Sequence, residues 1–407
     1  MRVLFTTTPG AGHVAPLLPL ARAVAQSGHD VAFAGSVSLR PSMQAAGFES
    51  FTAGRWIAEQ PGRAGAHAGG ATPYSAREAS IVNYLEVMVE SNTRFAVPDL
   101  IPICRQWRPD IVVREEAEFG GAVAAEHLGV AHAAVQVLFF HGRTGLEGAI
   151  SKRLDRIRGE WDLSPDPHLE MLHRYLFLSF TPPSFIRSKQ DIPSTMHFLK
   201  RAESDEGTEL GNLLSIELPL RRPVIYATLG TNMSRPQYLL PDGVPDVLPT
   251  LISSLQSVAG TLIVTVGRDR DPTEFGDYPP HVHVEQYVPQ HLIFPHCDLV
   301  VTHGGHNTVI PALGHGLPLV LIPFWSDQPD NAQRCTELGV GQVIEPLDVT
   351  PNRLRSGVEE VLRDPGYRQR AQGIREEMRG LPSIEHGVAL LEELARTKTP
   401  LLAGAES

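Results

Sequence analysis

The sequence predicts an α/β protein made of two consecutive domains, each with a parallel β-sheet between layers of helices. Short apolar runs alternate with helical segments in both halves of the chain, and that alternation is typical of a parallel sheet covered on both faces. The length of 407 residues also exceeds one ordinary domain of roughly 100 to 200 residues.

The apolar runs locate the expected strands and the boundary between the domains. The strands are expected at 2–7, 30–34, 111–113, 133–138, 224–227, 261–266, 299–302 and 319–322, with helices such as 17–27 and 120–128 between them. The Gly-, Pro- and charge-containing segment 203–222 predicts the linker. We therefore expect domains at 1–214 and 215–395, with the C-terminal helix free to pack back on the first domain. The aperiodic segments 54–80 and 140–185 are expected to be long loops or irregular helices, and the tail after Ala395 to be frayed.

Composition excludes several classes of partner. The chain has 35 basic and 46 acidic residues and a net charge of -11, which argues against the basic surface that nucleic-acid binding requires. The 3 cysteines are far apart, so neither a disulfide framework nor a cysteine zinc site is indicated, and a cytosolic protein is expected. No run of 18 apolar residues occurs, so we expect no membrane span.

A glycine-containing turn follows the first expected strand. In TTTPGAGHVAPLL, Pro9, Gly10 and Gly12 lead into a helix that begins near His13. Glycine lets the backbone turn tightly near a ligand, and the positive end of a helix dipole disfavours a protonated imidazole. His13 is therefore a candidate neutral base, although a histidine that only caps the helix fits the same pattern.

A more specific pattern follows the strand expected at 299–302. The residues between this strand and the next helix are His303, Gly304, Gly305, His306, Asn307 and Thr308. A strand, a glycine pair and a helix N-terminus form an anion site, because N–H groups and the helix dipole face a phosphate there. The sequence thus predicts a diphosphate site without a P-loop lysine. Asp327, Gln328 and Asn331 follow the next strand and suit sugar hydroxyls.

Four segments resemble the nucleotide-sugar-dependent glycosyltransferases of family 1, especially the actinobacterial enzymes that glycosylate macrolide, polyketide and enediyne-type natural products. The segments are GHVAPLLPLA at 12–21, YVPQ at 287–290, HGGHNT at 303–308 and ALGHGLPLVLIPFWSDQPDNA at 312–332. They occur in the family's order, and the resemblance covers nearly the whole chain. It implies the GT-B fold, in which an acceptor-binding and a donor-binding Rossmann-like domain face each other across a cleft.

The resemblance assigns roles to the residues at matching positions. His13 matches the base that takes the proton of the acceptor hydroxyl, and Glu115 stands where the family has the aspartate that orients this base, with Glu116 and Glu118 close by. A carboxylate beside the imidazole would raise its basicity and fix its tautomer. The donor-side residues are Gly230 and Thr231 at the distal phosphate, Tyr287 and the Val288 backbone at the base, Gln290 near the ribose, and Asp327 and Gln328 at the sugar.

One departure from the family concerns the donor nucleotide. The family usually has a glutamate three residues after the threonine, where it holds both ribose hydroxyls, and this chain has Pro311. A nucleotide with one hydroxyl fewer loses least from that change. We therefore favour a dTDP donor, with UDP as the alternative.

Other candidate sites are aromatic or metal-like. Tyr84, Phe139, Phe140 and Trp161 would suit an apolar acceptor pocket, although aromatic side chains more often belong to a core. Histidines are frequent between 281 and 315, and a DxD pattern stands at 269–271. Because the histidine spacing fits no zinc motif and the DxD lies in a charged loop, we expect no metal.

The sequence and the resemblance together predict an inverting, metal-independent glycosyltransferase without a further cofactor. It is expected to move a sugar, favoured as a deoxy sugar, from a dTDP-sugar to a hydroxyl of a hydrophobic natural-product aglycone in antibiotic biosynthesis in the cytoplasm. A homodimer is compatible with this interpretation. The alternatives are a UDP-sugar donor, a nucleotide-sugar 2-epimerase, and an inactive accessory protein of the same fold.

Overall fold

The computed structural model describes residues 1–55, 81–137, 145–188, 192–201, 220–230, 246–267 and 270–404. The chain forms two compact units: Met1–Ala66, Thr72–Ala202 and Leu381–Ser407 make up the first, and His67–Ala71 and Glu203–Gly380 the second. The domain boundary expected at 214/215 lies outside the described residues. The C-terminal segment is part of the first unit, because the chain returns to it at Leu381.

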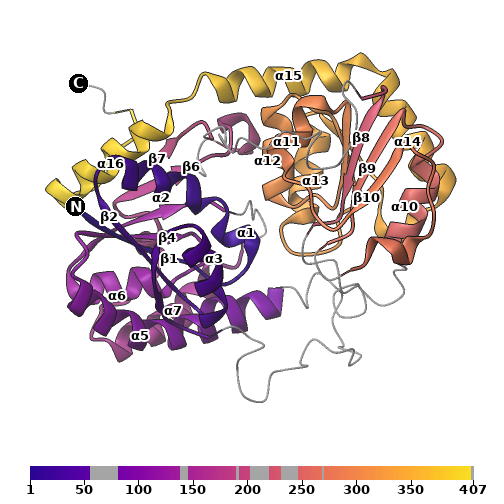
Figure 1. The fold of residues 1–407 in the computed structure, drawn as a ribbon. Helices are drawn as coiled ribbons and strands as arrows, with labels where there is room; N and C mark the ends of the chain where they lie inside the picture. Colours follow the sequence, from indigo (N-terminus) through magenta and orange to yellow (C-terminus); the bar gives the residue numbers. More distant parts are fainter. Residues whose placement is uncertain are drawn as a thin grey trace. The chain divides into compact units, whose positions relative to one another are not determined.

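The first unit contains a seven-stranded sheet in the order β3-β2-β1-β4-β5-β6-β7, with all pairs parallel and helices on both faces (Figure 1). The strands are β1 Arg2–Thr6, β2 Asp30–Gly35, β3 Glu49–Thr52, β4 Ile111–Glu115, β5 Ala131–Val135, β6 Leu176–Ser179 and β7 Met196–Phe198. The α-helices are α1 Ala11–Val14, α2 Leu17–Gln26, α3 Arg40–Ala45, α5 Asn92–Trp107, α6 Gly120–Leu128, α7 Glu147–Glu160 and α16 Ile384–Thr397. Shorter helical segments are η1 Val37–Leu39, the π-helix η3 Tyr84–Ser91, η5 Glu170–Leu172 and η6 Pro183–Phe185.

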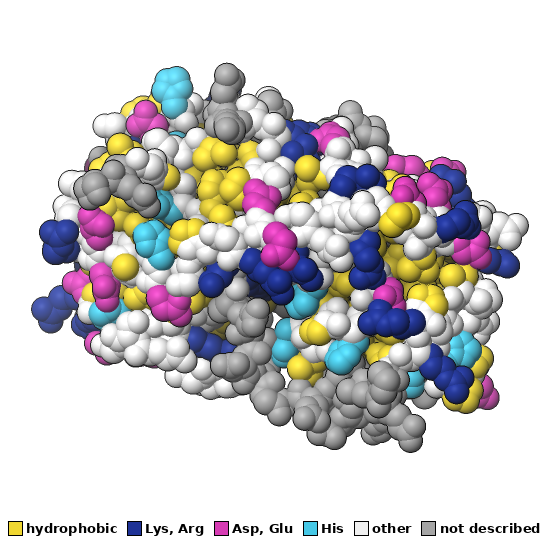
Figure 2. Space-filling view, turned by 90° about the horizontal axis from the view of Figure 1, so that it is seen from above, with side chains coloured by type: hydrophobic (Ala, Val, Ile, Leu, Met, Phe, Trp, Pro, Cys, Tyr) yellow, Lys and Arg dark blue, Asp and Glu magenta, His cyan; other side chains and the backbone are white. Residues whose placement is uncertain are grey.

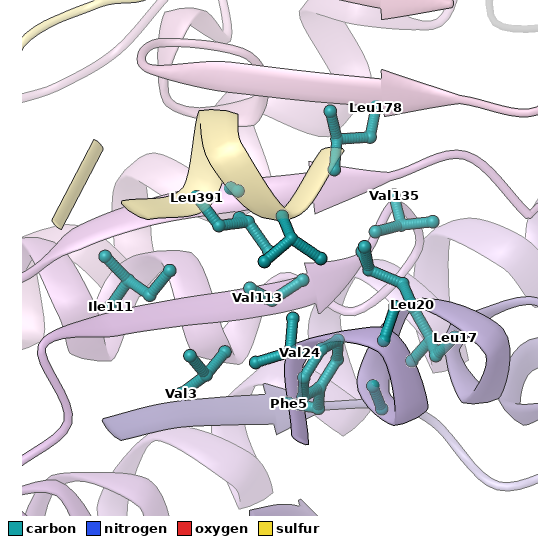
Figure 3. Packing of buried hydrophobic residues seen from close by; sticks show 14 of the residues in the cluster. Val3, Phe5, Leu17, Leu20, Val24, Ile111, Val113, Val135, Leu178 and Leu391 are labelled. Carbon is teal, nitrogen blue, oxygen red and sulfur yellow. The ribbon is translucent and has the colours of Figure 1, made fainter. Parts of the chain in front are cut away.

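One face of this sheet is buried under α2 and α16. Phe5 of β1 pairs in register with Phe33 of β2, and their rings stack with centroids 5.1 Å apart. Figure 3 shows Leu20 of α2 and Leu391 of α16 meeting over Val113 of β4. The opposite face packs against α5, α6 and α7 (Figure 1). Buried strands covered on both faces explain why the strands appear in the sequence as continuous apolar runs.

The second unit contains a six-stranded parallel sheet in the order β10-β9-β8-β11-β12-β13. The strands are β8 Val224–Thr228, β9 Thr261–Thr265, β10 Val282–Glu285, β11 Leu299–Thr302, β12 Leu319–Leu321 and β13 Gly341–Val343. The α-helices are α10 Val247–Leu255, α11 Gln290–Ile293, α12 His306–Gly314, α13 Gln328–Glu337, α14 Pro351–Arg363 and α15 Pro365–Arg379. Short 3₁₀ helices in the described part of this unit are η9 Pro272–Phe275, η10 Phe294–His296 and η11 Pro346–Asp348. Residues of α10 and α14 pack against one face of this sheet (Figure 1).

In both sheets, the first strand along the chain is a central strand, and the later strands are added on both sides of it. In the first, the strand order reverses between β1 and β4, and in the second between β8 and β11. Loops at the carboxyl ends of such neighbouring strands diverge to opposite faces, which opens a crevice where α/β proteins bind ligands. Ligand-binding residues are therefore expected in the segments that follow these four strands.

Some expected elements differ from those in the structure. The sequence predicts an irregular segment over 140–185, but α7 and β6 lie there. Ile150, Leu154 and Ile157 line the buried side of α7, and the charged residues between them hide this helical period. The sequence also predicts a frayed tail after Ala395, whereas the chain is held against the first unit as far as Ala403, whose N–H donates to the Ser194 carbonyl at 2.7 Å.

The surface carries charges of both signs. Figure 2 shows Lys and Arg side chains interspersed with Asp and Glu over the face that it displays. No helix in the described part of the chain is long and apolar enough to cross a membrane.

The C-terminal helix should contribute strongly to stability. Leu391 is 0% exposed, whereas Leu402, in the same terminal segment, is 52% exposed. Leu391→Ala leaves a cavity between α16 and the sheet, so it should lower the free energy of unfolding by about 2 to 5 kcal/mol. Leu402→Ala should change it by less than about 0.5 kcal/mol. Urea denaturation followed by circular dichroism measures both, and equal losses would contradict the packing described here.

Candidate functional site

The point at which the strand order reverses, between β1 and β4 in the first unit and between β8 and β11 in the second, is called the switch point. The switch point of the first unit contains a histidine–carboxylate pair. His13 lies on α1, directly after a turn in which Gly10 has a φ of 134° and its carbonyl accepts the His13 N–H at 3.0 Å. A Cβ at Gly10 would approach the His13 ring to 3.3 Å. Glu115 is the last residue of β4, two residues beyond the predicted strand end, and its Oε1 lies 3.0 Å from His13 Nδ1. The structure thus brings together two residues 102 positions apart.

Glu115 is fully buried, and donors surround it. The Thr8 hydroxyl donates to Oε1 at 2.7 Å, and the Ala117 N–H donates to Oε2 at 2.7 Å. Burial alone would raise the pKa of Glu115, but the charge and hydrogen bond of His13, with the bonds from Thr8 and Ala117, hold it below its usual value. Because an ionised carboxylate only accepts hydrogen bonds, the proton of a neutral His13 sits on Nδ1 and the lone pair on Nε2.

The loop after Glu115 is fixed by a buried arginine. Arg114 is 0% exposed, and its Nη1 donates to the carbonyls of Glu115, Glu116 and Glu118 at 3.3, 2.9 and 3.4 Å. Glu118 accepts from the Thr6 hydroxyl at 2.5 Å and from the Gly121 N–H. Burial raises the pKa of the Glu118 carboxyl, and the charge of Glu115 acts in the same direction. The acid whose carboxylate lies within hydrogen-bond distance of His13 Nδ1 is Glu115.

In the second unit, His303 follows β11 at the switch point and packs between two glycines. A Cβ at Gly230 would lie 2.7 Å from the His303 ring, and one at Gly305 would lie 2.5 Å from Nε2. Gly230 also has a φ of 81°. Burial lowers the pKa of His303 to about 4, although a hydrogen bond with the Thr228 backbone opposes the shift. His303 is therefore a neutral imidazole at pH 7, held where the glycines leave room for its ring.

The N-terminus of α12 is partly occupied by protein acceptors. The His306 N–H points to Asp327 Oδ2 at 3.4 Å, and the Thr308 N–H donates to the Gly305 carbonyl at 2.9 Å. Asn331 Nδ2 donates to Asp327 Oδ2 and to the Gly304 carbonyl, both at 2.8 Å. The 3.4 Å contact is long for a hydrogen bond. Fewer backbone N–H groups are thus available to an anion than the sequence predicts. The His306 N–H faces Asp327, and the Thr308 N–H donates to the Gly305 carbonyl.

The remaining donor-side residues lie around this helix. Gln290 Nε2 donates to Thr308 Oγ1 at 3.0 Å. Gln328 Oε1 accepts from the Phe324 N–H at 2.9 Å, Tyr287 is 49% exposed, and Val288 is buried. The resemblance assigns Gly230 to the distal phosphate, and its N–H donates to Thr228 Oγ1 at 3.2 Å. Thr231 lies outside the described residues.

Of the predicted acceptor residues, the structure describes Tyr84 and Trp161, and both pack against the hydrophobic core of the first unit that includes α5, α6 and α7. Trp161 stacks edge-on against His127 with ring centroids 5.5 Å apart, and its carbonyl faces His127 Nδ1 at 3.0 Å. His127 is near the C-terminus of α6, whose nine residues span about 14 Å. Trp161 therefore lies towards the ends at which the strands begin, whereas Glu115 lies where β4 finishes. The assignment of Trp161 to an acceptor pocket stays a prediction. Tyr84 lies on η3 against the α5–α7 core, and Phe139 and Phe140 lie outside the described residues.

Sequence reasoning missed Thr8 and Arg114. An arginine inside the apolar run IVVRE was the available signal, because a buried charge must have partners. Thr8 gave no separate signal within TTT. In the described part of the chain, no group of three His, Cys, Asp or Glu side chains is placed to hold a metal ion.

Both units match models of one protein family. Residues 22–158 match the model described as erythromycin biosynthesis protein CIII-like, N-terminal domain, and residues 249–394 match the C-terminal domain of the same description.

Individual relatives extend over nearly the whole chain. The chain is 28% identical to 10-deoxymethynolide desosaminyltransferase of Streptomyces venezuelae over 97% of each chain. It is 26% identical to 4'-demethylrebeccamycin synthase of Lentzea aerocolonigenes over 97% of this chain and 99% of that one. The solved structure of glycosyltransferase VinC in complex with dTDP superposes with a TM-score of 0.76 at 24% identity, covering 97% of this chain and 100% of that one. The GT-B fold expected from the sequence is confirmed.

The protonation of His303 can be measured directly. Its ring signals in a histidine-selective NMR spectrum, assigned with His303→Gln, should not titrate between about pH 5.5 and 8, because its pKa is about 4. The unfolded chain takes up this proton near the ordinary pKa of about 6.5. Wild-type stability should therefore fall, relative to the variant, as the pH drops from about 6.5 towards 4. A titration midpoint near 6.5 in the folded protein would contradict the buried environment.

Proposed function

Since the chain belongs to the erythromycin biosynthesis protein CIII-like family of glycosyltransferases, we propose that it transfers a deoxy sugar from a dTDP-sugar to a hydroxyl of a hydrophobic natural-product aglycone. The transfer inverts the anomeric carbon and uses no metal ion. The observation that carries the proposal is the His13–Glu115 pair at the first switch point.

This pair has the properties of a general base. The carboxylate fixes the Nδ1–H tautomer, so Nε2 is the atom that accepts a proton. The His13 side chain is 17% exposed, whereas Glu115 is 0% exposed. A substrate hydroxyl can therefore reach the imidazole, while the acid that orients it stays shielded from water.

The proposed step is a single displacement. The acceptor oxygen forms a bond to the anomeric carbon while the bond from that carbon to the phosphate oxygen breaks. The acceptor proton goes to His13 Nε2, and the electron pair of the broken bond leaves with dTDP. Attack from the side opposite the leaving group inverts the anomeric centre. A general base of this kind contributes about 10² to 10⁴ in rate.

The second unit supplies the leaving-group site. Negative charge grows on the diphosphate as the bond breaks, and the α12 N-terminus directs its dipole at that charge. Because the His306 contact with Asp327 is long, a phosphate oxygen can replace it at small cost. The neutral His303 ring adds a hydrogen-bonding group without a charge. Dipoles of this kind take the place of a metal ion in the proposal.

The preference for dTDP rests on Pro311. It lies inside α12, where the resemblance places the glutamate that grips both ribose hydroxyls, and a prolyl ring offers no acceptor. VinC, a similar fold, was crystallised with dTDP. UDP remains the alternative donor nucleotide.

The three cysteines fit a cytoplasmic enzyme. Cys104, Cys297 and Cys335 are buried and unbridged, as is common where thiols are kept reduced.

Two alternative functions on this fold would behave differently when the protein is given a nucleotide sugar. A 2-epimerase would convert the nucleotide sugar without any acceptor, and an inactive accessory protein would bind it without conversion. The intact His13–Glu115 pair favours the transferase over both. Incubation with donor alone, followed by product analysis, identifies an epimerase. Addition of an aglycone then separates a transferase, which forms a glycoside, from an accessory protein, which does not.

Replacement of His13 tests the base. His13→Ala should reduce turnover by a factor of about 10² to 10⁴. It should leave dTDP affinity nearly unchanged, because His13 belongs to the first unit and the proposed diphosphate site to the second. His168→Ala, at an exposed histidine of the first unit, is the matched control and should retain activity. Mass-spectrometric product analysis and calorimetry provide the two readouts. Undiminished turnover in His13→Ala would remove His13 as the base.

Calorimetric competition of dTDP with UDP tests the donor. The wild type should bind dTDP more tightly, and Pro311→Glu should shift the ratio towards UDP, because the new carboxylate can accept from both ribose hydroxyls. Pro311→Ala, which also removes the ring but adds no acceptor, is the control. Tighter UDP binding by the wild type would reverse the donor assignment.

A further inference from the structure

A cavity of about 20 Å³ lies within the first unit. Residues at the carboxyl ends of β1, β2 and β3 line it, together with the first turns of α5 and the loop before α6. This volume accommodates one water-sized group, such as a hydroxyl or an amino group. We call it the Asn92 cavity.

Asn92 contributes an acceptor without a partner to this cavity. The side chain is 8% exposed, and its Nδ2 donates to Met88 Sδ at 3.5 Å. Because a thioether sulfur can only accept, this contact fixes which end of the amide is which. The other end, Oδ1, is buried and has no hydrogen-bond partner among the described residues. A buried polar atom of this kind calls for a ligand group or a water that donates to it.

The neighbouring wall groups also present acceptors. The hydroxyl protons of three consecutive threonines are already used: Thr6 donates to Glu118, Thr7 to the Thr8 carbonyl, and Thr8 to Glu115. Each hydroxyl therefore offers only lone pairs to the cavity. Glu118, 5% exposed, adds a carboxyl group to the same wall. The wall also includes Arg55, whose guanidinium lies 5.6 Å from the Phe95 ring centroid.

The cavity adjoins the histidine–carboxylate pair through Thr8. This residue lines the cavity, and its hydroxyl holds the Glu115 oxygen that contacts His13. A group bound in the cavity would therefore hold its molecule beside the reacting hydroxyl. An acceptor-rich wall selects groups that donate hydrogen bonds.

We propose that the Asn92 cavity binds a second hydroxyl or amino group of the sugar acceptor, one that is not itself glycosylated, with Asn92 Oδ1 and the Glu118 carboxyl as its hydrogen-bond acceptors. The identity of the ligand as a sugar acceptor rests on the proposed function. The selection of a donating group rests on the cavity alone.

Fluorescence titration in the absence of any nucleotide sugar tests the cavity. The probes are 2,7-dihydroxynaphthalene and 2-naphthol, which differ by one hydroxyl. The wild type should bind the diol about threefold to tenfold more tightly, the effect of one added hydrogen bond. Asn92→Leu, which keeps the size but removes the acceptor, should abolish this preference. Asn352→Leu, at an exposed asparagine of α14, should retain it.

A crystal of the wild-type protein soaked with the diol gives a readout that needs no variant. The expected result is density for one hydroxyl within hydrogen-bond distance of Asn92 Oδ1. Ordered water alone in the cavity, or equal affinities for the two probes in the wild type, would overturn the proposal. Because neither readout involves turnover, a protein that binds the diol there but transfers no sugar would refute the proposed function and leave the cavity assignment intact.

Discussion

The first-unit site depends on keeping a carboxylate charged inside the protein. Glu115 is 0% exposed, and a buried carboxyl without partners would take up a proton. Three donors prevent this: the Thr8 hydroxyl, the Ala117 N–H and His13 Nδ1. Thr8 and His13 belong to the segment that follows β1, and Ala117 belongs to the loop after β4. The Glu115 carboxylate therefore links the segments that follow these two neighbouring strands. The orientation of the His13 imidazole follows from that charge.

Each unit has a histidine near the point where its strand order reverses, after β1 in the first unit and after β11 in the second, and the two environments differ. His13 faces a carboxylate and is partly exposed. His303 packs between Gly230 and Gly305, and burial lowers its pKa to about 4. One imidazole is therefore suited to accept a proton and the other to stay neutral beside a phosphate. The two histidines differ in these properties because their neighbours differ.

Much of the fold could be predicted from the sequence, because buried parallel strands are continuous apolar runs with turn residues between them. The edge strands β3, β7, β10 and β13 were missed, since they are short and half-polar, and β6 was missed within the segment expected to be irregular. The pairing of His13 with Glu115 could be expected only through the family resemblance. The contacts of Arg114, the use of the His306 N–H by Asp327 and the position of Trp161 depend on side-chain directions, which periodicity does not determine. The Asn92 cavity likewise arises from packing between segments far apart in the chain.

The turnover of Glu115→Gln, compared with Glu116→Gln, tests most directly whether the buried charge orients the base. Both substitutions remove one carboxylate and preserve side-chain size, and the carboxylate that lies 3.0 Å from His13 Nδ1 is that of Glu115. The first variant should lose at least about 100-fold in kcat, as expected when a general base is no longer held in place, while the second stays within about threefold of the wild type. Equal losses in both variants, or full activity in Glu115→Gln, would contradict the account.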